Sequence, residues 1–196
     1  MSDANQTYDV LIVGGGPVGL TLALALVQSA RGIRVGLVDR RPLAVPRDAR
    51  ASAIAAGVRR VFEALGVWPQ MADAAQPISA MRITDSGVGD IARPLFLAFD
   101  GEVAPGEAFA HMVPNSVSGQ VLLDAVADRI SVIAPATITG YAAEAGAARL
   151  MLDDGRVLAA PLLVAADGGQ SALRGMAGIG VIAHDYGQTG LVTTID

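Results

Sequence analysis

The stretch from Tyr8 to Asp39 limits what this chain can fold into more than any other part of the sequence. It contains a short apolar strand, a cluster of glycines, an alanine- and leucine-rich helix, a second apolar strand and an acidic residue where that strand ends. This order is typical of a unit that binds an adenine dinucleotide, because the helix N-terminus directs unpaired N–H groups at the phosphates. Asp39 follows Gly19 by twenty residues, where a carboxylate can accept hydrogen bonds from ribose hydroxyls.

Three glycines of the cluster have separate steric roles. Gly14 allows a tight turn, Gly16 lets the backbone approach a pyrophosphate, and Gly19 lets the helix pack closely on the strand. The spacing alone is weak evidence, because 23 glycines in 196 residues produce roughly 0.3 such matches by chance. The flanking strand, helix and acid therefore carry the prediction, against the alternative of a glycine-tolerant turn that binds nothing.

Composition excludes several classes of function. Apolar residues make up 52% of the chain and charged residues 17%, which is a globular composition. The net charge of −5 argues against nucleic acid as a partner. The absence of cysteine excludes disulfides, zinc-thiolate sites and thiol catalysis, so any redox chemistry must come from a cofactor. We predict no metal site and no catalytic side chain, and we interpret His111 and His184 as structural or surface residues.

The stretch from Val10 to Ala30 carries no charge for 21 residues, which is long enough to resemble a membrane span. The glycines and Pro17 in its middle would interrupt a spanning helix. A buried parallel strand followed by a buried helix is uncharged over the same length, so we interpret this stretch as part of a soluble α/β domain.

Hydrophobic periodicity predicts the remaining elements. The first helix should end in a basic last turn at Arg31 and Gly32. The later segments are a helix over 54–65, strands over 81–83 and 95–99, a helix from Ser118, strands around Val132 and Ile138, a hairpin over 150–158 with a turn at 153–156, a strand over 162–166 suited to the middle of a parallel sheet, a short helix from Ser171 and a strand over 190–196.

Two further motifs separate a flavin enzyme from a nicotinamide dehydrogenase. Arg50 should lie at the head of the second helix, where its guanidinium could reach a phosphate or the flavin side of a dinucleotide; the alternative is a solvated loop arginine. Asp167 and Gly168 follow a buried strand, so the acid could bond a ligand hydroxyl while the backbone passes close by. The alternative there is a strand-to-helix turn capped by Ser171.

Together these stretches resemble the group A FAD-dependent aromatic hydroxylases with the para-hydroxybenzoate hydroxylase fold. Within that group they are most similar to the ubiquinone-biosynthesis hydroxylases of the 2-polyprenyl-6-methoxyphenol hydroxylase type. The matching stretches, in family order, are 8–19, 48–53 with 65–68, 116–120, 164–174 and 186–189.

The resemblance implies an α/β fold with a Rossmann-like FAD-binding domain built on a parallel sheet. That domain would comprise 1–75 and 112–180, while 76–111 and 184–196 would begin a mostly antiparallel substrate-domain sheet. The family's third fingerprint, a Gly-Asp-Ala-Ala-His type of turn, does not occur between residues 170 and 196. We therefore expect a truncated chain, the N-terminal half of the enzyme, that binds FAD weakly and is inactive alone.

The resemblance also implies residues for the cofactor. The glycine cluster would bind the FAD pyrophosphate, and Asp39 would bind the adenosine ribose in place of the commoner glutamate. Arg50 would lie against the flavin half, and Gln120 near the pyrophosphate and ribityl chain. Asp167 and Gly168 would serve FAD and the passing NAD(P)H. The full predicted set is Gly14, Gly16, Pro17, Gly19, Asp39, Arg40, Arg50, Gln120, Asp167 and Gly168.

The implied function is FAD-dependent hydroxylation of a polyprenylated phenol in ubiquinone biosynthesis, with NAD(P)H and molecular oxygen consumed. The enzyme would be cytoplasmic. Because such a substrate resides in the membrane, the full-length protein could also make peripheral contact with the inner membrane or with other ubiquinone-biosynthesis proteins. Three alternatives stay open: an FAD monooxygenase of a soluble aromatic substrate, a simple NAD(P)-binding Rossmann dehydrogenase, and a non-catalytic nucleotide-binding module.

Overall fold

The computed structural model describes residues 5–45, 47, 49–85 and 91–191. The chain separates into two compact units: the first unit is Met1–Arg47 with Gly119–Ile195, and the second unit is Asp48–Ser118. The domain boundaries expected from the sequence stay a prediction. Of the strand expected over 190–196, residues 192–196 lie outside the described residues, and the two before them are irregular.

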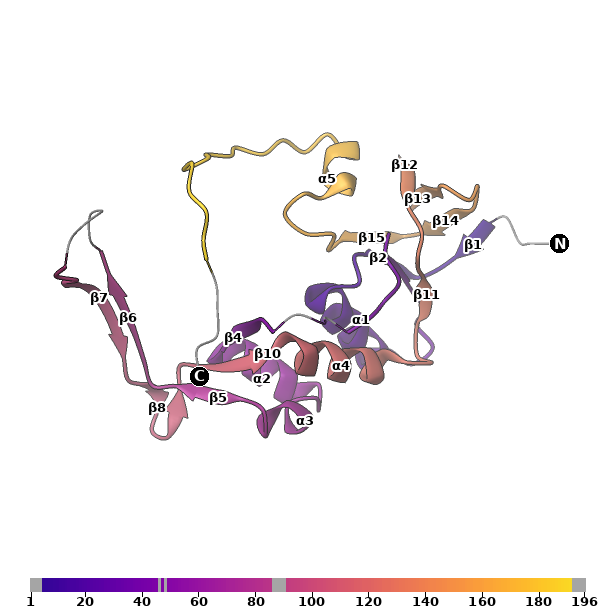
Figure 1. Cartoon of the computed structure of the whole chain (residues 1–196). Coiled ribbons are helices and arrows are strands. Elements are labelled where there is room, and N and C mark those ends of the chain that lie inside the picture. The colour runs from indigo at the N-terminus through magenta and orange to yellow at the C-terminus, as the bar shows by residue number, and fades with distance from the viewer. Residues whose placement is uncertain (1–4, 46, 48, 86–90, 192–196) are drawn as a thin grey trace. The chain divides into compact units, whose positions relative to one another are not determined.

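A four-stranded parallel sheet forms the centre of the first unit (Figure 1). Its strands, in spatial order, are β11 (Ser131–Ile133), β3 (Val35–Val38), β2 (Val10–Val13) and β15 (Leu162–Ala165). Every residue of β2 and β3 is buried. Apolar side chains on both faces suit such strands, because each face of a parallel sheet is covered by other elements.

Helix α1 (Pro17–Ser29) covers one face of this sheet. Proline is favoured at the first helical position, and the alanines and leucines that follow are strong helix formers. Leu20 and Leu24 are buried. The helix ends earlier than its sequence suggested, so the expected basic last turn is wrong. Ala30 is the C-cap residue, and Gly32, at a φ of +76°, belongs to the turn that leads into β3.

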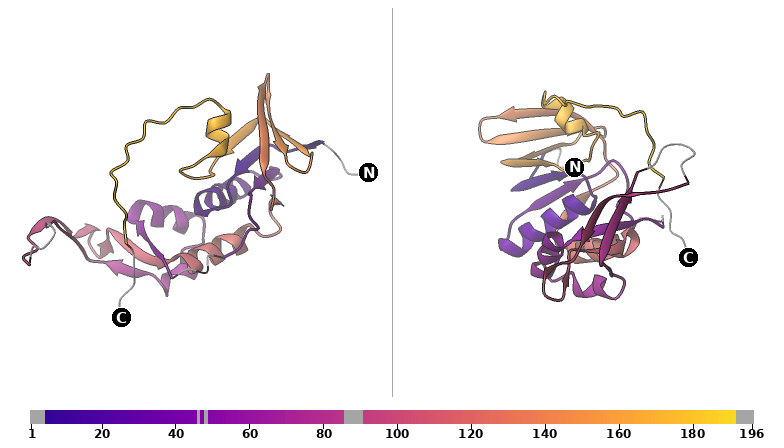
Figure 2. Two further views of the ribbon diagram at one scale, coloured as in Figure 1. Left: turned by 45° about the horizontal axis from the view of Figure 1, so that its top comes forward. Right: turned by 90° about the vertical axis from the view of Figure 1, so that its left-hand side faces the viewer.

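The second sheet of the first unit is mostly antiparallel and is seen in both views of Figure 2. Its strands, in order, are β1 (Asn5–Thr7), β14 (Val157–Ala160), β13 (Ala147–Leu152) and β12 (Ile138–Glu144), with β1 parallel to β14. The predicted hairpin is confirmed as β13 and β14, with Gly155 at a φ of +85° in the turn. Buried residues of both sheets form one core: Leu11, Val13, Val38, Ile133, Leu150, Leu152 and Leu158.

Helix α5 (Ala172–Met176) follows β15, and its N-cap is the predicted residue. The Ser171 hydroxyl oxygen accepts a hydrogen bond from the Arg174 backbone N–H at 3.0 Å. This contact satisfies one of the N–H groups that a helix start leaves unpaired.

The elements that the structure describes in the second unit are short. Its sheets are β4 (Ala51–Ala55), β10 (Ala110–Pro114) and β5 (Gln76–Ile78); β6 (Ala80–Thr84) with β7 (Leu95–Asp100); and β8 (Glu102–Ala104) with β9 (Glu107–Ala108), all antiparallel. Its helices are α2 (Ala56–Ala64) and α3 (Pro69–Ala72), while α4 (Asn115–Val126) starts in this unit and continues into the first. The strands within 76–111 pair antiparallel, as in these sheets, and the assignment of 76–111 to a substrate domain stays a prediction.

Two further expected elements differ from the structure. Ile54 was expected in a helix but lies in β4, because β4 pairs with β10, and Ile54 is paired with His111, 57 residues later in the chain. The strand from Leu162 was expected in the middle of the parallel sheet, but among the described strands it pairs with β2 alone and forms an edge. The α/β fold class predicted from the sequence is confirmed. Within the described ranges, no helix has the length and apolar character needed to cross a bilayer.

Candidate functional site

The carboxyl ends of the parallel strands meet at one edge of the sheet, and hydrogen bonds join the loops that leave it. The Gly14 N–H donates to the Val38 carbonyl oxygen at 2.8 Å, which holds the glycine turn against the end of β3. The Ala166 N–H donates to the Val13 carbonyl oxygen at 2.7 Å, which holds the Asp167 turn against the end of β2. Ligands of open α/β sheets bind at this edge.

A cavity of about 420 Å³ lies at this edge, entirely within the first unit. We call it the sheet-edge pocket. Seven of the ten predicted cofactor residues line it: Gly14, Gly16, Pro17, Asp39, Arg40, Asp167 and Gly168. The glycine turn and the Asp167 turn, far apart in the sequence, therefore face the same space.

The glycines of the turn have different surroundings. A methyl group at Gly14 would overlap the Ala166 carbonyl oxygen, and the φ of this residue is +111°. A methyl group at Gly19 would overlap the Gly14 carbonyl oxygen, which is the close packing of helix and strand expected from the sequence. At Gly16, by contrast, no described atom outside Gly16 and its two chain neighbours lies within 4 Å of the position of a Cβ. Gly14 and Gly19 thus serve the fold, and Gly16 keeps space open in the pocket.

The two acids of the pocket are held in different ways. Asp39 Oδ2 accepts a hydrogen bond from the Gly15 N–H at 2.7 Å, and Oδ1 accepts one from the Arg41 N–H at 2.8 Å. Asp167 Oδ2 accepts a hydrogen bond from the Leu173 N–H at 3.3 Å. Asp167 Oδ1 is buried and accepts no hydrogen bond from the residues that the structure describes. Since buried polar atoms are normally paired, this oxygen is a candidate ligand contact.

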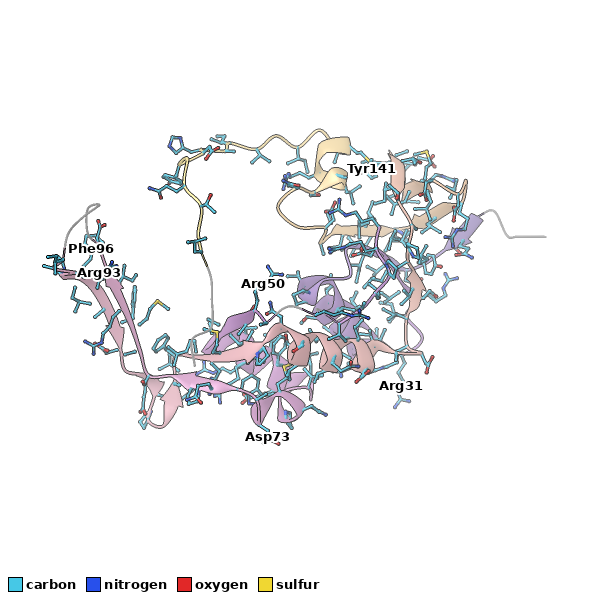
Figure 3. All side chains as sticks on the ribbon, viewed as in Figure 1. Arg31, Arg50, Asp73, Arg93, Phe96 and Tyr141 are labelled. Atoms are coloured by element: carbon cyan, nitrogen blue, oxygen red, sulfur yellow. The ribbon has the colours of Figure 1, made fainter. Side chains whose placement is uncertain are left out.

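The remaining predicted residues do not line the pocket. Arg50 (labelled in Figure 3) belongs to the second unit and directly precedes β4, so its expected position at the head of a helix is wrong. Its carbonyl oxygen accepts a hydrogen bond from the Asn115 N–H at 2.9 Å. Gln120 is exposed on α4, where its Nε2 donates to Asp124 Oδ1 at 2.7 Å. Their predicted contacts with a cofactor stay predictions.

One wall of the pocket was not predicted from the sequence. Ala136, Thr137 and Ile138, which follow β11, line the cavity together with Arg41 and Gln170. A signal was available: the strand around Val132 was predicted, and the residues after any parallel strand lie at the same sheet edge. The loop carries no charged residue between Val132 and Ile138, so it does not stand out in the sequence.

A second cavity of about 420 Å³ also includes Asp167 and Gly168 in its lining. Its other polar side chains belong to Tyr141, labelled near α5 in Figure 3, Ser171 and Arg174. The Asp167 turn therefore borders two cavities, both within the first unit.

The two histidines lie outside both cavities. The His111 ring contacts Trp68 edge to face at a centroid distance of 5.3 Å, and His184 contacts Tyr186 in the same way at 4.9 Å. In the part of the chain that the structure describes, no three His, Cys, Asp or Glu side chains are grouped to hold a metal ion.

Comparison with known proteins identifies relatives of the whole chain. Residues 7–195 match a family model described as an FAD binding domain. Ubiquinone hydroxylase UbiL of Rhodospirillum rubrum is 36% identical over 199 residues, which covers 98% of this chain and 44% of UbiL. The 3-demethoxyubiquinol 3-hydroxylase of Escherichia coli is 30% identical over 203 residues, covering 97% of this chain and 49% of that protein.

Among solved structures, p-nitrophenol 4-monooxygenase PnpA of Pseudomonas putida has the same fold, with a TM-score of 0.71. The identity is 21%, and the match covers 88% of this chain and 44% of PnpA. The chain spans about half the length of the curated relatives it matches.

Proposed function

Because the chain belongs to the FAD binding domain family, we propose that the whole protein is a monooxygenase that uses FAD and NAD(P)H to hydroxylate a polyprenylated phenol in ubiquinone biosynthesis. The family match confirms the flavoprotein family predicted from the sequence. The observation that carries the site is the pocket shared by Gly16, Asp39 and Asp167. The substrate class is supported by the names of the two ubiquinone-pathway relatives.

The residues of the sheet-edge pocket fit an FAD. The space at Gly16 admits a group close to the backbone, at the start of α1 where helix N–H groups lack partners. The first turn of α1 carries no acidic side chain that would repel a phosphate. Asp167 Oδ1 lacks a partner among the described residues, and Asp39 retains acceptor capacity because a carboxylate offers about four lone-pair sites.

Each part of the pocket would bind one part of the cofactor. The pyrophosphate is held by Gly14, Gly16 and the first turn of α1. Pro17 has a φ that suits the first helical position, and it lacks a backbone N–H that would otherwise need a partner there. Asp39, with Arg40 beside it, holds the adenosine ribose. The Asp167 turn contacts the flavin-bearing half. We extend the proposal to Arg50 at the flavin and to Gln120 near the pyrophosphate, as the family resemblance implies, while Gly19 acts through packing.

The bound FAD would accept electrons from NAD(P)H and activate molecular oxygen, chemistry that amino-acid side chains do not supply. The chain's own residues bind and orient the cofactor and limit access of water. The second cavity, with Arg174 and Ser171 beside the Asp167 turn, supports a role for this turn towards NAD(P)H as well. A polyprenylated substrate dissolves in lipid. We therefore propose that the whole protein is cytoplasmic and makes peripheral contact with the inner membrane or with other ubiquinone-biosynthesis proteins.

A flavin titration tests the site. We expect FAD to bind the purified protein weakly, with quenching of flavin fluorescence that reaches one FAD per chain at saturation. NADH and NADPH should show no tight binding in the absence of flavin. The opposite pattern, with tight nicotinamide binding and no FAD binding, would support the simple Rossmann dehydrogenase instead.

A turnover assay tests the substrate class in the whole protein. NAD(P)H oxidation and oxygen uptake are measured with a prenylated phenol and with the same phenol lacking the prenyl chain, and the product is analysed by mass spectrometry for one added oxygen atom. We expect hydroxylation of the prenylated phenol. Efficient hydroxylation of only the soluble phenol would favour the alternative of a soluble aromatic substrate.

A further inference from the structure

The order of the strands orders the loops along the sheet-edge pocket. β11, β3, β2 and β15 lie side by side in that order and all run parallel. Adjacent strands are about 4.8 Å apart. The loops at their carboxyl ends therefore follow one another across the pocket as Ala136–Ile138, then Asp39, then Gly14, then Asp167, and each of them lines the cavity.

This order of the loops assigns the pyrophosphate and the adenosine of a bound dinucleotide to different parts of the pocket, which rests on the proposed function. The pyrophosphate lies at the glycine turn, and Asp39 at the adjacent strand contacts the adenosine ribose. Because adenine is attached to the far side of that ribose, it must extend away from Gly14 towards the loop after β11. The wall made by Ala136, Thr137 and Ile138 then belongs to the adenosine half of the site.

Backbone hydrogen bonds hold this wall to the neighbouring strand. The Asp39 N–H donates to the Ile133 carbonyl oxygen at 3.2 Å, and the Ala136 N–H donates to the Asp39 carbonyl oxygen at 2.8 Å. The same segment that carries the ribose contact thus also fixes one end of the wall.

The middle of the wall, at Thr137, is held by the β13–β14 turn. Asp153 Oδ1 accepts a hydrogen bond from the Thr137 N–H at 3.1 Å, and the Asp153 N–H donates to the Thr137 carbonyl oxygen at 2.9 Å. Leu152, next to Asp153, and Leu158 in the facing strand are buried in the core. The turn is therefore anchored to a packed hairpin and can fix both polar backbone groups of Thr137.

We infer that Asp153 is a positioning residue for the adenosine half of the dinucleotide site, acting through the backbone of Thr137. The turn is more than a connection between two strands, because its acid sets the position of a pocket wall to which it contributes no lining atom.

Isothermal titration of the purified protein with FAD and ADP, and competition of FMN against FAD, test this inference in three variants. Asp153→Ala removes the side-chain acceptor, Asp153→Asn keeps an oxygen at that position, and Asp154→Ala is the matched control. Asp154 lies in the same turn, but within the described part of the chain its side chain accepts hydrogen bonds only from Arg156, at 3.0 Å from the backbone N–H and at 2.7 Å from Nε.

We expect Asp153→Ala to weaken ADP and FAD binding by about five-fold, the effect of one hydrogen bond. FMN, which lacks adenosine, should bind as it does to the wild type. Asp153→Asn should restore most of the ADP affinity, and Asp154→Ala should leave it unchanged. Urea unfolding of each variant reports whether general stability accounts for the loss.

Unchanged ADP affinity in Asp153→Ala would overturn the inference, and so would an equal loss of ADP affinity in Asp154→Ala. Neither result would contradict the proposed FAD site. A parallel loss of ADP and FMN affinity would also overturn it, since it would indicate general loosening. A wild-type protein that binds neither FAD nor ADP overturns the proposed function itself and this inference with it, and is thus distinguishable from the other outcomes.

Discussion

At the scale of single residues, the glycine turn shows how one sequence motif combines two separate requirements. Gly14 is needed by the fold, because its φ is +111° and a side chain would overlap the Ala166 carbonyl. Gly16 has a φ of −77°, which any residue can adopt, and has open space around it. The two positions should therefore respond differently to the same substitution.

Gly14→Ala should lower the free energy of unfolding by more than about 2 kcal/mol, because the methyl group meets backbone and the φ is unfavourable for alanine. Urea denaturation measures the change. Gly169→Ala is the control, since no described atom outside Gly169 and its two chain neighbours lies within 4 Å of a Cβ there, and its effect should stay within about 0.5 kcal/mol. Equal stability of the two variants would contradict the packing seen at Gly14.

Gly16→Ala should leave the free energy of unfolding within about 0.5 kcal/mol of the wild type. Its methyl group enters the space proposed for the pyrophosphate, so FAD affinity should fall by about ten-fold or more. Flavin fluorescence titration measures the affinity beside the urea experiment. Unimpaired FAD binding in this variant would place the phosphates elsewhere.

At the scale of elements, one carboxylate joins α2 to β9 in the second unit. Glu107 Oε2 accepts from Arg60 Nη2 at 2.7 Å, and Oε1 accepts from Arg59 Nη2 at 2.7 Å. Hydrogen bonds from the Arg60 side chain, and to a smaller extent from the Arg59 side chain, hold the pKa of Glu107 below its ordinary value. The ionised form is thus favoured in the folded state.

This pKa shift predicts the pH dependence of stability. A lowered pKa in the folded state stabilises the protein fully above the pKa of the unfolded chain, about 4.3 for glutamate, and this stabilisation is lost as the pH falls through the lower folded value. Glu107→Gln should therefore reduce the melting temperature at pH 7, and the difference from the wild type should shrink towards pH 3.

Asp100→Asn provides the matched control for Glu107→Gln. Asp100 and Arg82 form a longer and more exposed pair, 3.4 Å apart, and exposed pairs contribute little to stability. Its melting temperature should stay near that of the wild type at both pH values. A difference between Glu107→Gln and the wild type that does not change with pH would contradict the ionic origin of the effect.

The element scale is also where prediction from the sequence was least complete. The helix predicted over 54–65 was correctly located by its apolar spacing, but its first residues form β4 because β10 supplies hydrogen-bond partners from a distant part of the chain. The apolar strand from Leu162 was recognised, yet its place at the edge of the described sheet depends on which strands lie beside it. Local periodicity contains neither piece of information.

At the scale of the whole molecule, the two compact units carry different parts of the prediction. The sheet-edge pocket lies in the first unit alone. The second unit exposes large apolar side chains on β6 and β7, among them Phe96, which is 73% exposed (Figure 3). Ligand binding should therefore change the loops of the first unit more than β6 and β7.

Hydrogen–deuterium exchange tests this expectation. Addition of FAD should increase protection most in peptides that contain residues 13–18, 38–41, 136–138 and 166–172, because a bound ligand stabilises the conformation that it contacts. Peptides from β6 and β7 serve as the internal control and should change least. Protection spread evenly over the chain would indicate a general stabilisation without a defined pocket.

The sequence by itself determined the glycine turn, the helix that follows it and the acid at the end of β3, because each of these depends on local backbone geometry within about thirty residues. It also indicated the Asp167 turn. Only the tertiary structure decided that these segments share a pocket with Ala136–Ile138, and that Asp153 holds that wall. Such neighbours are chosen by hydrogen bonds and packing between strands far apart in the chain, which no local pattern of residues records.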